Sequence, residues 1–333
     1  MNDGAPLLQA ERLTRHYAVS RGPFRAKGIV RALDGVSFIV RAAETLAVVG
    51  ESGCGKSTLA RQVTMIERPS SGELKVGGTD VANADKATLK RLRPTVQMIF
   101  QNPYASLNPR KKIGTLLEEP LAISGGGDAA SRRVAARAMM AKVGLRPEHY
   151  RRYPHMFSGG QRQRIAVARA LMLHPQLVVA DEPVSALDVS IQAQVLNLMM
   201  DLQQEMGIAY LFISHNLQVV RHIADAIAVM YLGKIVEYGP KADVFARPAH
   251  PYTRSLLAST PRLRRDGVRG AADAATERGA IRGEPPSPLT LLPGCAFHRR
   301  CPYAIERCRV DVPALEPLGK ALVACHRAAE INA

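Results

Sequence analysis

A phosphate-loop motif constrains the fold of this chain more than any other feature of its sequence. It fits the pattern Gly-x4-Gly-Lys-Ser/Thr and comprises Gly50, Glu51, Ser52, Gly53, Cys54, Gly55, Lys56, Ser57 and Thr58. Residues 45–49 are apolar and predict a short buried strand before the loop, and residues 59–63 predict a helix after it. This strand–loop–helix unit indicates an α/β fold that binds a nucleoside triphosphate.

The residue types in the loop suit phosphate chemistry. Glycines allow successive backbone N–H groups to turn inward around the β-phosphate, and the N-terminus of the following helix adds partial positive charge. We expect Lys56 to reach the β- and γ-phosphates and Ser57 to ligate Mg²⁺, with Thr58 beside it in the nucleotide site.

Length and charge set broad limits on the class of protein. With 333 residues the chain can form two domains, and no stretch approaches the roughly 18 to 20 apolar residues that span a bilayer. The N-terminus has no secretory signal pattern, so we expect a cytosolic protein. The net charge of +16 fits nucleic acid, an anionic membrane surface or a basic proteome, and does not choose among them.

The remaining sequence alternates between strand and helix patterns. Residues 7–68 suggest a β-rich entry, and residues 102–156 an inserted helical subdomain. Helices are predicted over 161–173 and 191–205 and strands over 177–180 and 208–213, which favours a mainly parallel sheet. After Pro251 the composition shifts to Arg, Pro and Gly, with arginines clustered over 262–269, and predicts a linker or lightly structured segment.

Two adjacent carboxylates follow the apolar strand at residues 177–180. Because side chains alternate along a strand, Asp181 and Glu182 can have different roles. We expect Asp181 to hold the water shell of the Mg²⁺ bound at Ser57, and Glu182 to polarise a water for in-line attack on the γ-phosphate.

A second glycine loop precedes the helix predicted over 161–173, with Ser158, Gly159, Gly160 and Gln161. It is a further anion site at a helix N-terminus, which suggests that it serves a nucleotide held by a partner subunit. Its Ser-Gly-Gly-Gln motif, between the phosphate loop and the Asp-Glu strand, resembles the signature of ATP-binding-cassette ATPases, and the resemblance covers residues 7–251.

The resemblance implies roles for further residues. Tyr17 is similar to the adenine-stacking aromatic residue of the family, and Gln101 to the glutamine that senses Mg²⁺ and the transport domain. Asp188 resembles the dimer-loop aspartate, and His215 the switch histidine that contacts the γ-phosphate. In such proteins two chains enclose two ATP molecules, each between the phosphate loop of one chain and the signature of the other.

The implied fold is α/β: a P-loop ATP-binding cassette with a RecA-like parallel-sheet core, an N-terminal antiparallel β subdomain, the helical insert at about 102–156 and a small Cys-containing C-terminal extension. Residues 1–250 are the nucleotide-binding domain and residues 251–333 the extension.

Residues 101–110, 182–190 and 250–253 resemble the importer ATPases for dipeptides and oligopeptides and, in related systems, nickel or glutathione. The resemblance implies two integral membrane permeases, a sister ATPase in a heterodimer and an extracytoplasmic substrate-binding protein as partners. The chain would then lie peripherally on the cytoplasmic face of the membrane. An ATPase directed at nucleic acid is the alternative class, disfavoured because no long coiled coil interrupts the core.

The tail carries the cysteines Cys295, Cys301, Cys308 and Cys325, with gaps of five, six and sixteen residues. Cysteine clusters in cytosolic proteins favour metal over disulfides. The tail resembles that of peptide-importer ATPases, some of which hold a [4Fe–4S] cluster there. Zn²⁺, with His298 or His326 as alternate ligands, and unligated thiols remain open.

Overall fold

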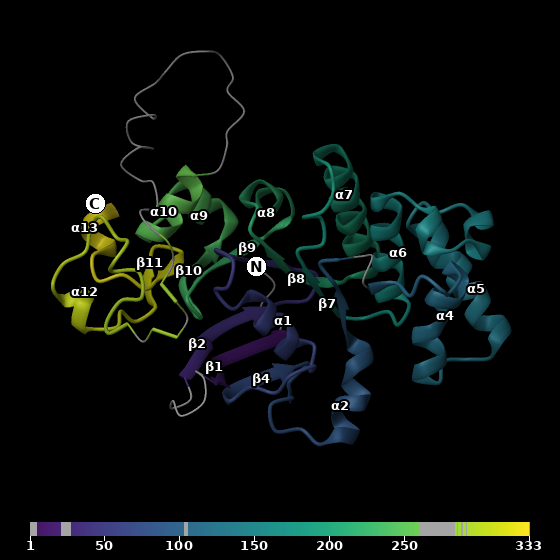
Figure 1. Ribbon diagram of the computed structural model, residues 1–333, viewed down its shortest axis with the longest axis horizontal. Coiled ribbons are helices and arrows are strands. Elements are labelled where there is room, and N and C mark those ends of the chain that lie inside the picture. Colours follow the sequence, from purple (N-terminus) through teal and green to yellow (C-terminus); the bar gives the residue numbers. More distant parts are fainter. Residues whose placement is uncertain are drawn as a thin grey trace, which may run out of the picture.

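The chain folds around two β-sheets (Figure 1), in a computed structural model that describes residues 5–20, 28–102, 106–259, 284, 286–287, 289–290 and 292–332. The strands are β1 (Leu8–Val19), β2 (Gly28–Val40), β3 (Thr45–Val49), β4 (Ser71–Val76), β5 (Thr79–Asp80), β6 (Val96–Ile99), β7 (Leu177–Asp181), β8 (Ala209–Ser214), β9 (Ala226–Tyr231), β10 (Lys234–Pro240), β11 (Glu316–Leu318) and β12 (Ala321–Val323). Within this described part, an eight-stranded sheet has the order β11-β12-β10-β9-β3-β8-β7-β6, and a four-stranded sheet the order β2-β1-β4-β5.

Helices surround the sheets. They are α1 (Lys56–Val63), α2 (Lys86–Leu92), α4 (Ile113–Ser124), α5 (Ala129–Lys142), α6 (Gly159–Leu171), α7 (Val189–Met206), α8 (Leu217–Ile223), α9 (Lys241–Ala246), α10 (Pro251–Ala258), α12 (Arg307–Val310) and α13 (Ala328–Asn332). Short 3₁₀ turns are η1 (Arg93–Thr95), η2 (Pro147–Arg151) and η3 (Pro154–Met156). The strands predicted over 45–49, 177–180 and 208–213 are confirmed as β3, β7 and β8, and the helices predicted over 161–173 and 191–205 as α6 and α7.

The strands β6, β7, β8, β3 and β9 run parallel to one another and form one side of the larger sheet, which ends at β6, whereas β10 pairs antiparallel with β9. Every residue of β3, β7, β8 and β9 is buried, as expected for parallel strands covered on both faces. Alternate side chains of β7 enter two different cores, Leu177 and Val179 one and Val178 and Ala180 the other. Since parallel strands end at the same edge, the segments that follow β6, β7, β8 and β3 come together there.

The four-stranded sheet is antiparallel and lies against the phosphate-loop helix. Residues Leu8, Leu13, Val36 and Val40 of β1 and β2 are fully buried and share one core with Leu59 of α1. This packing brings β2 next to the loop that precedes α1 (Figure 1).

The helices α4 and α5, within residues 102–156, and the C-terminal tail lie at opposite ends of the molecule (Figure 1). The tail contributes β12, which pairs antiparallel with β10 through Glu237↔Val323 and Tyr238↔Leu322, and β11, which pairs with β12. The tail strands therefore extend the core sheet instead of forming a separate one.

The segment after Pro251 differs from the sequence-based expectation of a lightly structured stretch, because residues 251–258 form α10. His250 caps this helix by accepting the Tyr252 N–H at Nδ1, 3.0 Å away, and Pro251 occupies the first turn, where its missing N–H costs no hydrogen bond. The arginine cluster at 262–269 lies outside the described residues.

Within the residues that the structure describes, no helix combines the length and apolar character required to cross a membrane.

Candidate nucleotide-binding site

The phosphate loop joins β3 to α1 and folds closely against β2. Gly55 has φ 108°, and an added Cβ there would lie 2.1 Å from the carbonyl oxygen of Ala32, so only glycine fits. The Lys56 ammonium donates to the carbonyl oxygens of Gly50 at 2.8 Å and Glu51 at 2.9 Å. The loop thus surrounds the buried cation that the sequence assigns to the phosphates.

A hydroxyl and a carboxylate meet beside the loop, at the start of α1 and the end of β7. Burial raises the pKa of Asp181, while a hydrogen bond with Ser57 opposes the shift. Hydroxyl and carboxylate oxygens are the ligand types that Mg²⁺ prefers. These two residues therefore fit a Mg²⁺ site that also uses phosphate oxygens.

Two polar side chains, from the ends of β6 and β8, converge on the carboxylate of Glu182 at the end of β7. Gln101 after β6 donates to Glu182 Oε2 at 2.8 Å, and His215 Nδ1 after β8 lies 3.0 Å from Glu182 Oε1. Glu182 itself has φ 47°, a left-handed conformation that is uncommon outside glycine and is typical of functional sites. The structure thus brings together Glu182, the predicted base, and the two residues for which the family resemblance implies roles, Gln101 and His215.

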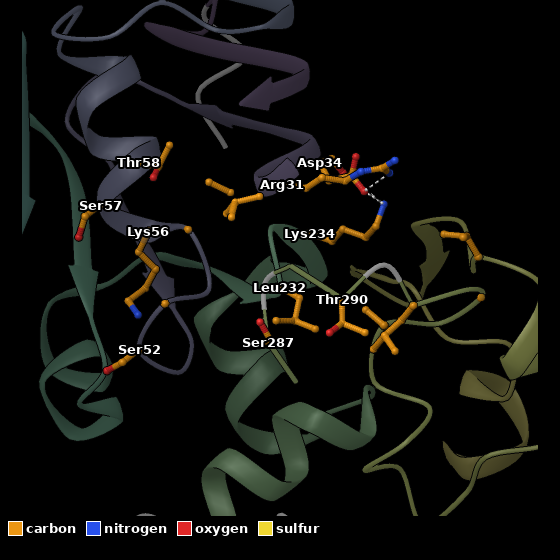
Figure 2. Close-up of a pocket in the computed structure, with 18 of the residues that line it drawn as sticks. Arg31, Asp34, Ser52, Lys56, Ser57, Thr58, Leu232, Lys234, Ser287 and Thr290 are labelled. Atoms are coloured by element: carbon orange, nitrogen blue, oxygen red, sulfur yellow. Dashed lines mark hydrogen bonds and ion pairs between the residues drawn. The ribbon is translucent and has the colours of Figure 1, made fainter. Parts of the chain in front are cut away.

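A cavity of about 680 Å³ opens in front of the phosphate loop. Figure 2 shows Lys56 and Ser57 on one side of it and Ser287 and Thr290 of the tail across from them. Its walls come from six parts of the chain: the phosphate loop with the start of α1, β2, the segment after β6, the segment after β7, the β9–β10 turn and the tail. The lining residues are Val30, Arg31, Ala32, Asp34, Ser52, Gly53, Gly55, Lys56, Ser57, Thr58, Gln101, Glu182, Leu232, Lys234, Ser287, Thr290, Leu292, Pro293, Gly294, Ala296, Val310 and Val312.

Tyr17, the predicted adenine-stacking residue, is not among the residues that line this cavity. It pairs with Val30, which does line it, across the β1–β2 ladder. The Tyr17 hydroxyl donates to Glu67, and the Arg15 guanidinium lies 4.7 Å from the ring centroid. In this arrangement Tyr17 contacts the side chains of Arg15 and Glu67.

The second glycine loop lies apart from the cavity. Ser158 caps α6, accepting the Gln161 N–H at 3.4 Å, while Gln161 accepts the Ser158 N–H at 3.1 Å. A Cβ added to Gly159 would lie 3.3 Å from Leu187, and one added to Gly160 only 2.4 Å from Ile191 Cγ2.

The predicted dimer-loop residue Asp188 is exposed at the N-terminus of α7, where its side chain makes no capping hydrogen bond. None of Ser158, Gly159, Gly160, Gln161 and Asp188 lines the cavity formed by their own chain.

The contribution of the tail to this site was not predicted from the sequence. The Arg300 guanidinium donates to both carboxylate oxygens of Glu51 in the phosphate loop, at 2.7 and 3.0 Å. The two residues are 249 positions apart, so no local pattern could reveal their pairing. An arginine between cysteines in the tail was the only available signal.

The tail cysteines are partly or fully buried and carry free thiols. Burial raises the pKa of Cys295 to about 11 and that of Cys301 to about 12, and the charges of the other tail thiols add to the shift. In the part of the chain that is described, however, no group of three or more His, Cys, Asp or Glu side chains is arranged to hold a metal ion. This geometry does not support the predicted [4Fe–4S] cluster or its Zn²⁺ alternative.

Comparison with known proteins shows the family to which this chain belongs. Residues 33–185 match the ABC transporter family, and residues 236–308 match the C-terminal region of oligopeptide/dipeptide transporters. The chain is 60% identical over 322 residues to the di/tripeptide transport ATP-binding protein DppF of Pseudomonas aeruginosa, covering 97% of this chain and 98% of that protein. It is 58% identical to the dipeptide transport ATP-binding protein DppF of Escherichia coli, over 96% of this chain and 94% of the other.

Solved structures of ATP-binding cassettes share the fold of this chain. A dimeric ATP-binding cassette in a post-hydrolysis state, bound to ADP and Pi, superposes with a TM-score of 0.63 at 25% identity, covering 70% of this chain and 98% of that one. CbiO1 of Clostridium perfringens, part of an ABC transporter complex, gives a TM-score of 0.63 over 72% of this chain and 91% of the other.

Proposed function

The chain belongs to the ABC transporter family of ATP-binding proteins, and we propose that it hydrolyses ATP to energise the import of dipeptides or oligopeptides through a membrane permease. The observation that carries this proposal is the identity of 60% along nearly the whole chain to a di/tripeptide transport ATP-binding protein. The match of residues 236–308 to the C-terminal region of oligopeptide/dipeptide transporters supports it independently of the ATPase core.

The hydrolytic step uses residues that already lie together. Lys56 would leave the carbonyls of its own loop to bind the β- and γ-phosphates, and Ser57 and Asp181 would hold Mg²⁺. The bound ion would neutralise charge on the phosphate oxygens. Glu182 accepts a proton from the attacking water, and His215 and Gln101 fix the orientation of its carboxylate.

A second cassette completes the site. Ser158, Gly159, Gly160 and Gln161 lie outside the cavity of their own chain, so we propose that they contact the γ-phosphate of a nucleotide bound by a sister ATPase. The dimeric state of the related cassette with ADP and Pi supports such a pair. Asp188, exposed at the start of α7, then faces the partner chain.

The assembly that we propose contains this chain, a sister ATPase, two integral membrane permeases and an extracytoplasmic protein that delivers the peptide. The chain would act at the cytoplasmic face of the membrane as a peripheral subunit. Within it, residues 1–250 would form the nucleotide-binding domain, with the helical insert at about 102–156, and residues 251–333 the extension. Tyr17 would turn toward the adenine when nucleotide binds.

For the extension we propose a [4Fe–4S] cluster on Cys295, Cys301, Cys308 and Cys325. The support is proximity, because the Cys295 N–H donates to the Cys308 carbonyl oxygen at 2.8 Å and Cys295 and Cys301 pack against the same hydrophobic core. Ligation requires the thiols to turn from their described orientations. Iron and acid-labile sulfide in anaerobically purified protein test the proposal, and protein with all four cysteines changed to Ser is the control. Iron-free wild-type protein overturns it.

Affinity purification of the tagged chain from membranes in mild detergent, followed by mass spectrometry, tests the transport function. We expect two multi-span permeases and a sister ATPase, and ATPase activity stimulated by a peptide-loaded binding protein. Stimulation by nickel or glutathione instead of peptide would move the chain to a related importer. Recovery of only nucleic-acid-associated partners would overturn the transport function.

A further inference from the structure

The phosphate loop is held by the C-terminal tail. Glu51, the second residue of the loop, is bound at three points: its carboxylate accepts two hydrogen bonds from Arg300, its N–H donates to the Tyr252 hydroxyl at 2.9 Å, and its carbonyl oxygen accepts from Lys56. One tail residue and one α10 residue therefore fix the same loop residue that contacts the phosphate-binding lysine.

Residues outside the phosphate loop also hold the Arg300 side chain in place. Its side chain is only 6% exposed, and it donates to the Tyr231 hydroxyl at 3.3 Å. The rings of Tyr231, Tyr252 and Phe297 pack against one another with centroids 4.7 to 5.4 Å apart, and the Arg300 N–H donates to the Phe297 carbonyl oxygen at 3.0 Å. A guanidinium held in this way presents its two-pronged face in a single orientation.

We propose that Arg300 is a positioning residue for nucleotide binding: through Glu51 it sets the conformation of the phosphate loop, so that the C-terminal extension controls the affinity for ATP. The inference rests on the proposed nucleotide site and adds to it a residue that does not touch the nucleotide. A salt bridge on a solvated loop contributes little, whereas this pair is largely shielded and two-pronged.

The same contact has a consequence for the reaction. Lys56 would exchange the Glu51 carbonyl for phosphate when nucleotide binds. A displaced Glu51 would therefore change the conformation of the nucleotide-free loop and the free energy of nucleotide binding. Glu182, Gln101 and His215 come from other strand ends and interact with one another. Loss of Arg300 should therefore raise the KM for ATP more than it lowers kcat.

The test measures MgADP binding to the full-length chain by calorimetry, because ADP occupies the phosphate loop without being hydrolysed. Arg300→Leu should raise the Kd about tenfold, and Arg300→Lys, which keeps the charge but loses the fork, about threefold. Arg309→Leu is the matched control, since this tail arginine is 67% exposed and pairs only with Glu306 among its described ion-pair partners. It should change the Kd by less than about twofold.

A mutant cycle separates positioning from general stabilisation. Glu51→Gln should weaken MgADP binding, and adding Arg300→Leu to it should cause little further loss, because the two residues act as a pair. If Arg300→Leu does not fold, Arg300→Lys and Glu51→Gln decide the matter.

Folded Arg300 variants with an unchanged Kd, or fully additive losses in the cycle, overturn the positioning role and leave the nucleotide site intact. A wild-type chain that binds no MgADP overturns the proposed function itself.

Discussion

The two glycine loops of this chain have similar local sequences and opposite surroundings. Each places glycines at the N-terminus of a helix, α1 for the phosphate loop and α6 for the loop at Ser158. The phosphate loop lies against β2, encloses Lys56 and is tied to the tail by Arg300. The loop at Ser158 packs its glycines against α7 and its flank and contributes nothing to the cavity of its own chain. A helix N-terminus therefore becomes a complete anion site only when other elements close around it.

Replacing the predicted base should give the largest effect, and it separates binding from turnover. Glu182→Gln keeps the size of the side chain and removes its capacity to accept a proton, so we expect ATP hydrolysis to fall by about 10² to 10⁴. MgADP affinity depends on the phosphate loop and should not change. Steady-state ATPase assays on the assembled transporter, with calorimetry on the isolated chain, provide the measurement. Unchanged turnover would refute the role of Glu182.

A pair of glycine substitutions tests the comparison directly. Gly55→Ala places a Cβ 2.1 Å from a backbone oxygen at φ 108° and should abolish MgADP binding by the isolated chain. Gly160→Ala places a Cβ 2.4 Å from Ile191 Cγ2, which should reduce turnover of the assembled pair but leave binding by the isolated chain unaltered.

Ile191→Ala removes the clashing atom and should restore part of the turnover lost in Gly160→Ala. Equal loss of MgADP binding in the Gly55→Ala and Gly160→Ala chains would show that both loops serve the same nucleotide, contrary to the comparison.

Replacing two helix-capping residues, one at a time, distinguishes the capping role of Ser158 from its proposed role in contacting a nucleotide on the sister ATPase. Ser158 caps α6 and Asp128 caps α5, where Asp128 accepts the Ser131 N–H at 2.8 Å. Changing either to Ala should reduce stability, because each change removes one capping hydrogen bond. Only Ser158→Ala should also reduce the ATPase rate of the assembled pair, by about tenfold, as expected for loss of a hydrogen bond to charge. Equal rates in the two variants would assign Ser158 a structural role alone.

The sequence sufficed for the core of the fold because its determinants are local. Uninterrupted apolar runs predicted β3, β7 and β8, and the motif residues Asp181 and Glu182 stand at strand ends where the parallel topology gathers them. The helix α10 and the Arg300–Glu51 pair could not be predicted in this way. A helix of eight residues gives a weak periodic signal, and the ion pair joins positions 249 residues apart. That ion pair depends on the packing of Phe297 and Arg300 of the tail against Tyr231 at the end of β9.

The smallest effect that we predict concerns the buried support behind the phosphate loop. His250 is 1% exposed, and burial lowers its pKa from 6.5 to about 3. Between pH 6.5 and about 3, His250 therefore binds a proton in the unfolded chain but not in the folded chain, so the free energy of unfolding decreases as the pH falls through this range. Between pH 7 and 5.5 this linkage amounts to about 1 kcal/mol.

His250→Asn keeps a side-chain acceptor for the Tyr252 N–H and removes the titration. The variant should have a smaller free energy of unfolding at pH 7, because Asn fills less of the space beside Phe297, yet lose less stability on acidification than the wild type. Denaturant unfolding at the two pH values gives both quantities. The same pH dependence in the two proteins would mean that other groups cause the acid sensitivity. A weaker pH dependence of stability in the variant would assign the titration to His250, beside Tyr252. The Tyr252 hydroxyl binds Glu51 of the phosphate loop. Among the described contacts, the loop at Ser158 has no such support from the tail or α10.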